Sequence, residues 1–382
     1  MTKHPSQLEM LETLISSPSV SSTHSHLDIS NQAVINHLAE WFDNIGFTVE
    51  IQPLPDQPTK ANMIARIGDG EDGLVLSGHT DTVPCDEHLW QVDPFKFTHQ
   101  DDRYYGLGSS DMKSFFALVI SSLNDINIHK LKKPLTILAT ADEESSMAGA
   151  KAILKDQDKL GRYCVIGEPT SLKPIRQHKG IFMECIRLVG QSGHSSDPAL
   201  GNNALEGMHE IIYALMNYRD HLGSQFVNHD FAVPFPTLNL GHIHGGDNAN
   251  RICGQCELHY DLRILPGMNI NNVRNDLREI ISDLARHRNL KCEFTSLFDG
   301  TPALSTSADS HLVKFSEQLT NTNSEAVVFA TEGPYFSQMG MDTIILGPGN
   351  IDVAHQPNEY IEIQQLESAV PIYKSFIQKF CL

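Results

Sequence analysis

Residues 74–81 read Leu-Val-Leu-Ser-Gly-His-Thr-Asp, a short apolar run that ends in a histidine and an aspartate. The same arrangement recurs at residues 135–144, Leu-Thr-Ile-Leu-Ala-Thr-Ala-Asp-Glu-Glu, and at residues 164–170, Cys-Val-Ile-Gly-Glu-Pro-Thr. Apolar runs of this length are typical of strands that are buried on both faces of a parallel sheet. The sequence therefore predicts buried strands, each of which runs into a histidine or an acidic residue.

Helical patterns separate these strands. Apolar residues recur at helical spacing in residues 8–15 and 35–45, and a further helix is expected at residues 112–126. Further short apolar runs occupy residues 47–51, 63–67 and 343–346. Helices interleaved with buried strands indicate an α/β fold with a mixed, mainly parallel sheet covered by helices on both faces.

The middle of the chain has a different order of elements. The pattern predicts four strands, at residues 182–189, 237–243, 255–264 and 291–297. It predicts one helix after the first strand, at residues 203–219, and another after the third, at residues 269–288. That βαββαβ order is typical of a ferredoxin-like α+β domain. The first pattern resumes with a helix near 310–319 and a closing helix from residue 364. We therefore expect one domain formed by residues 1–177 and 299–382, with a second domain, residues 178–298, inserted into it.

Length and charge limit the classes of function. A chain of 382 residues is too long for one typical hydrophobic core, which favours two domains. The net charge of −19 argues against nucleic acid and anionic membranes as partners and is compatible with a cationic small molecule. No apolar run approaches the roughly 18 residues that span a bilayer, and the N-terminus shows no secretory signal. We expect a cytoplasmic protein.

The cysteines do not form a disulfide framework. They are odd in number and scattered, at positions 85, 164, 185, 253, 256, 292 and 381, as in reduced intracellular proteins. Cys253 and Cys256 form a Cys-x-x-Cys pair, but no second pair completes a zinc knuckle.

Five candidate metal ligands follow the predicted strands or begin the predicted helix: His79, Asp111, Glu144, Glu168 and His355. Ligands of open parallel sheets bind beyond the carboxyl ends of the strands, so these side chains are expected to converge. A single acid at a strand end is most often a helix cap or a solvated charge, but five converging groups favour a site. Imidazole and carboxylate without thiolate suit a hydrolytic zinc, cobalt or manganese centre.

Other catalytic motifs are weaker. The Gly-Leu-Gly of residues 106–108 lacks the third glycine of a dinucleotide loop. No Gly-x-Ser-x-Gly follows a strand, which argues against a nucleophile elbow. Cys85 lies near His79 in sequence, yet its neighbours are of the metal-binding type.

Four motifs resemble those of the M20 metallopeptidase family: residues 79–84, 108–113, 141–144 and 167–170. The resemblance covers nearly the whole chain and includes residues 238–246, 346–349 and 354–360. Ser114 stands where the family usually has glycine, and Gly333 stands where alanine is expected. Neither departure removes a predicted ligand.

The resemblance implies a centre with two divalent metal ions, zinc first and cobalt or manganese as alternatives. His79 and Glu168 would bind one ion, Glu144 and His355 would bind the other, and Asp111 would bridge them. It also implies a cis peptide bond between Asp111 and Met112.

The resemblance implies further roles. Glu143 would be the general base, and the Asp81 carboxylate would orient the His79 imidazole. His194, which sequence alone favours as a loop histidine, would contact the reaction intermediate from the partner subunit of a homodimer formed through the inserted lid domain. The implied substrate-binding residues are Asn250, Arg263 and Glu332.

Within the family, the motifs are most similar to those of enzymes that hydrolyse N2-acetyl-L-ornithine to L-ornithine and acetate in arginine biosynthesis. Succinyl-diaminopimelate desuccinylase or a broader N-acyl-amino-acid amidohydrolase is the nearest alternative. Residues 331–334, Thr-Glu-Gly-Pro, favour the deacetylase, because desuccinylases usually carry a Gly-Thr-Ser-Asp-like stretch there. A non-catalytic metal-binding scaffold is a third interpretation.

Overall fold

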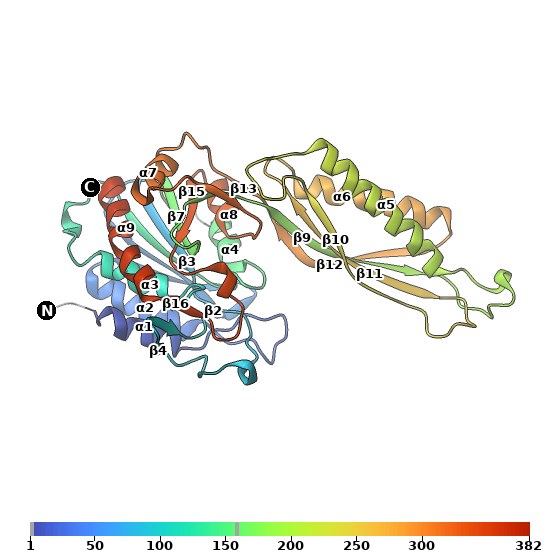
Figure 1. Cartoon of the computed structure of the whole chain (residues 1–382), viewed down its shortest axis with the longest axis horizontal. Coiled ribbons are helices and arrows are strands. Elements are labelled where there is room, and N and C mark those ends of the chain that lie inside the picture. Colours follow the sequence, from blue (N-terminus) through green and yellow to red (C-terminus); the bar gives the residue numbers. More distant parts are fainter. Residues whose placement is uncertain (1–3, 157–159) are drawn as a thin grey trace. The chain divides into compact units, whose positions relative to one another are not determined.

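The computed structural model describes residues 4–156 and 160–382 (Figure 1). The chain divides into two compact units. The large unit comprises Met1–Arg176, Thr306–Glu325 and Glu332–Leu382, and the small unit comprises Gln177–Ser305 and Ala326–Thr331. The small unit is thus inserted into the sequence of the large one.

The large unit is built on a mixed, mainly parallel sheet, as predicted. Its strands follow the order β1 (Thr48–Leu54), β2 (Gln57–Ile67), β6 (Leu135–Thr140), β3 (Leu74–His79), β7 (Tyr163–Pro169) and β15 (Asp342–Gly347). Neighbours among β6, β3, β7 and β15 are parallel, whereas β1 and β2 join antiparallel at one edge. Beyond β15 the hydrogen-bonded order continues with the short strands β8 (Ile175–His178) and β13 (Leu304–Ser305), and β14 (Glu325–Val327) pairs with β8.

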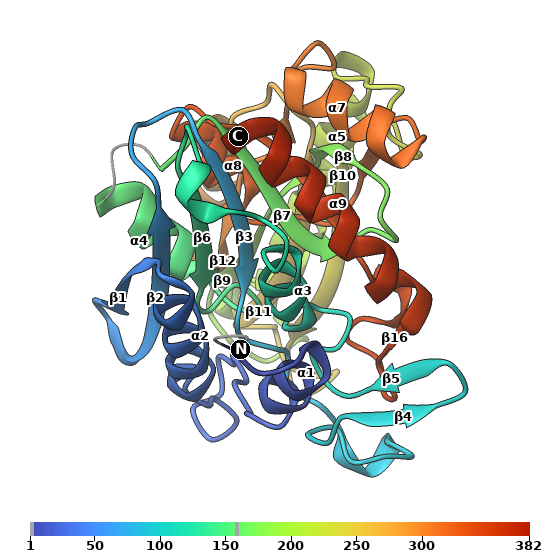
Figure 2. The same cartoon turned by 90° about the vertical axis from the view of Figure 1, so that its left-hand side faces the viewer.

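Helices cover both faces of this sheet (Figure 2). One face packs into the main hydrophobic core with α1 (Gln7–Ile15), α2 (Gln32–Ile45), α3 (Ser114–Ser122), α7 (His311–Thr320) and α9 (Ile363–Cys381). The other face is covered by α4 (Ala148–Asp156) and α8 (Gly333–Gln338). Both faces of the central strands are therefore buried, which explains their continuous apolar runs.

The helix predicted at residues 112–126 is shorter in the structure. α3 begins at Ser114, because the residues directly before it form a turn. The peptide bond between Asp111 and Met112 is cis. The Ser114 hydroxyl donates to the carbonyl oxygen of Ser109, so the residue that departs from the family pattern ties α3 to the preceding loop.

Several short elements were not predicted. β4 (Thr98–Gln100), β5 (Arg103–Tyr105) and β16 (Tyr360–Glu362) form a small antiparallel sheet. The 3₁₀ helices of the large unit are η1 (Glu87–Leu89), η2 (Ile128–Lys130) and η4 (Ile351–Val353). Such short segments carry too few residues to show a periodic pattern.

The small unit has the predicted βαββαβ order. Its antiparallel sheet follows β10 (Thr237–Gly245), β11 (Gln255–Ile264), β9 (Gly180–Val189) and β12 (Lys291–Thr301). α5 (Ala204–Gln225) and α6 (Ile270–His287) pack on one face of this sheet, and η3 (Pro198–Leu200) precedes α5. Among the described residues of the whole chain, no helix combines the length and apolar character needed to cross a bilayer.

Candidate metal centre

The predicted ligands of the large unit gather at the carboxyl ends of its parallel strands. His79 is the last residue of β3, Glu168 lies near the end of β7, and Glu144 is in the turn that follows β6. Asp111 and His355 reach the same place from loops, as their contacts show. All but the half-exposed His355 have mostly buried side chains.

Asp111 lies between the two histidines. Its Oδ1 is 2.9 Å from Nε2 of His79, and its Oδ2 is 3.4 Å from Nε2 of His355. Nε2 of His79 also lies 3.7 Å from Oε1 of Glu168, and Nε2 of His355 lies 3.1 Å from Oε1 of Glu144. Two pairs of one imidazole and one carboxylate therefore share a single aspartate, which is the arrangement that two adjacent cations require.

Asp81 contributes mainly through its backbone. The Nδ1–H of His79 donates to the Asp81 carbonyl oxygen at 2.9 Å, whereas the Asp81 carboxylate is 3.7 Å from that nitrogen. The carbonyl contact fixes the tautomer that leaves Nε2 free to bind a metal. The carboxylate instead accepts from the backbone N–H groups of Glu143 and Glu144, at 3.2 and 3.1 Å.

A buried lysine holds the turn that carries Glu143 and Glu144. The Lys60 ammonium lies 2.5 Å from the Asp142 carboxylate and 2.7 Å from that of Asp28. Asp142 adopts a φ of 61°, a conformation uncommon for residues other than glycine. The ion pair therefore fixes an unusual turn that directs two adjacent glutamates.

Sequence reasoning assigned no role to Glu359, which is fully buried next to Asp111. Its carboxylate accepts from the backbone N–H groups of Gly108, Ser110 and Asp111, at 3.2, 2.7 and 3.0 Å. Burial raises the pKa of Glu359 to about 7 although these three hydrogen bonds lower it. The residue positions the loop of the bridging aspartate; the only local signal was its place in the motif at residues 354–360.

The carboxylates of the centre repel one another. Burial and then Glu168 raise the pKa of Glu143 well above its usual value. Burial and then Asp111 raise the pKa of Glu144, and also that of Glu168 to about 7. Hydrogen bonds with Asp111 and Glu144 raise the pKa of His355 to about 11. Divalent cations would relieve this excess of negative charge, so the residues fit the group that the family implies.

Glu332 is a further buried acid close to this centre. Its Oε2 accepts from the Thr140 hydroxyl at 2.8 Å, whereas Oε1 has no hydrogen-bond partner among residues 4–156 and 160–382. Burial raises the pKa of Glu332 to about 8. A buried carboxylate with an unpartnered oxygen can accept a cationic group.

We expect the metal-free chain to lose stability between pH 6.5 and 8. The raised pKa values of Glu168, Glu332 and Glu359 mean that the fold keeps protons which the unfolded chain releases above about pH 4.5. The stability contributed by these groups is complete below that pH and is lost as the pH rises through 7 to 8. The raised pKa of His355 acts in the same direction above pH 6.5.

Two other groups make the fold more stable as the pH rises, but only outside the range from pH 6.5 to 8. Burial lowers the pKa of His178 to about 4 and that of Lys113 to about 8, so they act below about pH 6.5 and above about pH 8. Each acid that keeps its proton in the fold after the unfolded chain has released it costs about 1.4 kcal/mol of stability per pH unit, so calorimetry of the chelated protein should show Tm falling by about 5 °C between pH 6.5 and 8. Glu332→Gln should reduce the fall, and a Tm that rises across the window would contradict the assignment.

The other predicted site residues belong to the small unit. Nδ1 of His194 lies 2.7 Å from the hydroxyl oxygen of Ser196. The carbonyl oxygen of Asn250 accepts from the backbone N–H of Ser195. Arg263 lies on β11, where its Nε donates to the Asp261 carboxylate at 2.9 Å. His194 and Asn250 are thus brought to neighbouring loops, whereas Arg263 stands on a strand.

Curated relatives match this chain over its full length. An acetylornithine deacetylase of Vibrio campbellii is 47% identical over 377 residues, covering 99% of each chain. An acetylornithine deacetylase of Salmonella typhimurium is 46% identical, covering 99% of this chain and 98% of the relative.

Solved structures share the fold at low sequence identity. An M20 family metallo-carboxypeptidase of Sulfolobus solfataricus has a TM-score of 0.76 at 17% identity, covering 98% of this chain and 99% of that one. A dinuclear metal-binding M20 peptidase of Bacillus subtilis has a TM-score of 0.66 at 15% identity, covering 98% and 97%.

The model of peptidase family M20/M25/M40 matches residues 75–379, which include every candidate ligand described above. This match confirms the family resemblance that the sequence motifs indicate. It also confirms the prediction that the chain is a metal-dependent amidohydrolase. The chain belongs to peptidase family M20/M25/M40.

Proposed function

We propose that the chain hydrolyses N2-acetyl-L-ornithine to L-ornithine and acetate, as a step of arginine biosynthesis in the cytoplasm. The observation that carries this proposal is Asp111, which directs one carboxylate oxygen to each of two histidines. The full-length similarity to acetylornithine deacetylases supports the choice of substrate.

We assign the metal ligands as the sequence motifs imply. His79 and Glu168 would hold one ion, Glu144 and His355 would hold the other, and Asp111 would contact both. Zinc is the proposed ion, with cobalt or manganese as alternatives, because the ligands are imidazoles and carboxylates. When bound, such ions supply Lewis-acid activation of an amide carbonyl and lower the pKa of water.

Glu143 is the proposed general base. It is buried, lies in one cluster with His79 and Glu168, and its N–H is held by the Asp81 carboxylate. The environment that raises its pKa makes its carboxylate a better proton acceptor. Glu143 takes a proton from the attacking water and gives it to the leaving amine nitrogen.

Two charged residues are proposed to select the substrate. Glu332, with its unpartnered Oε1, accepts the δ-ammonium, and the planar guanidinium of Arg263 binds the α-carboxylate. Asn250 and His194 contribute hydrogen bonds to the reacting acyl group, and His194 comes from the second subunit of a homodimer formed through the small unit, which serves as the lid.

Glu332→Gln is expected to raise KM for N2-acetyl-L-ornithine by about 10- to 100-fold, because a charged hydrogen bond is worth about 1.5–3 kcal/mol. N-acetyl-L-norvaline, which lacks the ammonium group, is the control and should show no such change. Arg263→Lys should raise KM for both compounds, since both carry the α-carboxylate. Equal effects of Glu332→Gln on the two substrates would contradict its assignment.

Parallel steady-state assays test the function itself. The protein is treated with a chelator, reloaded with zinc, cobalt or manganese, and given N2-acetyl-L-ornithine or N-succinyl-diaminopimelate. Preference for the acetyl compound supports the deacetylase, and preference for the succinyl compound would identify a desuccinylase. Metal binding without hydrolysis of any N-acyl amino acid would favour the non-catalytic scaffold.

A further inference from the structure

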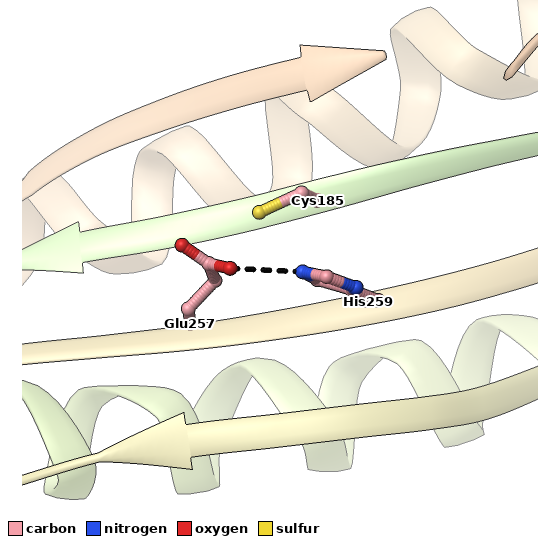
Figure 3. Close-up of side chains that lie close together, drawn as sticks. All are labelled: Cys185, Glu257 and His259. Atoms are coloured by element: carbon pink, nitrogen blue, oxygen red, sulfur yellow. Dashed lines mark hydrogen bonds and ion pairs between the residues drawn. The ribbon is translucent and has the colours of Figure 1, made fainter. Parts of the chain in front are cut away.

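A second group of metal-ligand side chains lies in the small unit. Cys185 on β9 and Glu257 and His259 on β11 place their ligand atoms within 4.8 Å of one another. Figure 3 shows these three side chains directed toward one another from the two strands. None of them belongs to the centre described above, and the proposed hydrolysis uses none of them.

The strand register explains how these groups meet. Cys185 pairs directly with His259 across β9 and β11. Their sequence neighbours Ile186, Leu258 and Tyr260 belong to the core that packs against α5 and α6. Side chains alternate between the faces of a strand, so Cys185, Glu257 and His259 lie on the opposite face of the sheet.

An irregularity in β10 adds a fourth group. Leu240 pairs with Tyr260, but the next pair is His242 with His259, so Gly241 is an extra residue in β10. In a regular strand His242 would face the helices. The bulge instead turns His242 toward His259, and their ring centroids are 4.6 Å apart. Cys185, His259 and His242 thus form one row across three neighbouring strands.

We propose that Cys185, His242, Glu257 and His259 bind one zinc ion on the open face of the small-unit sheet. Thiolate, two imidazoles and a carboxylate are a complete ligand set for tetrahedral zinc. Bonds of about 2.0–2.3 Å at tetrahedral angles require ligand atoms about 3.3–3.8 Å apart. The ligand atoms of Cys185, Glu257 and His259 lie within 4.8 Å of one another and the ring centroids of His242 and His259 are 4.6 Å apart, so side-chain rotations would bring the four groups onto one ion. The ion would fasten β10 and β11 to β9.

Glu257 is held in an orientation that suits this role. Its Oε2 accepts from Nε and Nη2 of Arg187, at 2.8 and 2.6 Å. Its Oε1 lies 2.9 Å from Nε2 of His259, and the two atoms share a hydrogen bond. A bound ion would replace the proton of that hydrogen bond. Arg187 can keep its contacts while Oε1 binds the metal, as residues outside a ligand shell commonly do.

A groove borders two of the four proposed ligands, His242 and Glu257, whereas Cys185 is buried. This groove of about 750 Å³ is lined by Arg187, His242 and Glu257 among other residues, and gives an ion a path of entry. Burial and then Glu257 raise the pKa of the Cys185 thiol to about 11. Zinc binds the thiolate, so binding of the ion releases the thiol proton.

Cobalt titration of the full chain, freed of metal by chelation, tests the proposal. A cobalt–thiolate bond gives charge-transfer absorption in the near ultraviolet, and the ligands assigned to the catalytic pair include no sulfur. We expect this absorption in the parent protein, its loss on adding zinc, and its absence in Cys185→Ser together with one fewer bound ion per chain. His259→Gln should weaken cobalt binding by about 10- to 100-fold.

Two cysteine variants serve as controls. Cys292 lies on β12 and packs toward the core, and Cys85 lines a small cavity that also includes His355. Cys292→Ser and Cys85→Ser should both keep the absorption, and the metal-free melting temperature of Cys185→Ser should match that of the parent. Absence of the absorption in the parent protein, or its persistence in Cys185→Ser, would overturn the proposal.

Discussion

Glu143→Gln is expected to lower kcat by about 10²- to 10⁴-fold while the protein still binds both metal ions of the catalytic pair. The amide keeps the shape of the side chain and the hydrogen bond from Glu143 N–H to Asp81. It removes the carboxylate that would carry the proton from water to the leaving amine. Glu143→Ala should give the same result, since loss of the proton carrier and not of volume is responsible.

The measurement is steady-state kinetics together with metal analysis of the same sample. Glu71→Gln, which changes an exposed glutamate in a loop, is the matched control and should leave both values unaltered. A variant with the parent kcat would show that Glu143 is not the base. A variant that loses one metal ion would show that Glu143 is a ligand instead.

Asp111→Asn is expected to remove both ions and to abolish hydrolysis. Each carboxylate oxygen faces a different histidine, so loss of the charge weakens both sites at once. Glu168→Gln, by contrast, should release only the ion beside His79. Metal content after gel filtration should therefore fall by two ions per chain in the first variant and by one in the second.

Asp352→Asn provides the control, because Asp352 is exposed and precedes His355 by three residues. It should keep both ions. Loss of only one ion in Asp111→Asn would mean that Asp111 binds a single metal, and the pair would have to be bridged in another way.

The parallel strands and the predicted ligands could be read from sequence because both depend on local patterns. Strands buried on two faces must be continuously apolar, and the residue that follows each one must lie at the sheet edge. That reasoning placed His79 and Glu144 together, although 65 positions separate them. The mixed fold and the family are confirmed.

What sequence reasoning missed depends on contacts between distant segments. Glu359 supports the Asp111 loop through backbone N–H groups about 250 positions earlier, and no local pattern marks such a contact. The motif His-x-Asp suggested a carboxylate–imidazole contact, whereas the Asp81 carbonyl is the nearer acceptor. The start of α3 depends on the turn at Met112, which helical spacing alone cannot reveal.

The most direct test of the account is anomalous X-ray scattering at the zinc edge from a crystal of the zinc-loaded protein. Two peaks about 3.5–4 Å apart are expected beside Asp111, one near His79 and Glu168 and the other near Glu144 and His355. A single peak there, or peaks that make no contact with Asp111, would contradict the shared-aspartate centre on which the proposed reaction depends.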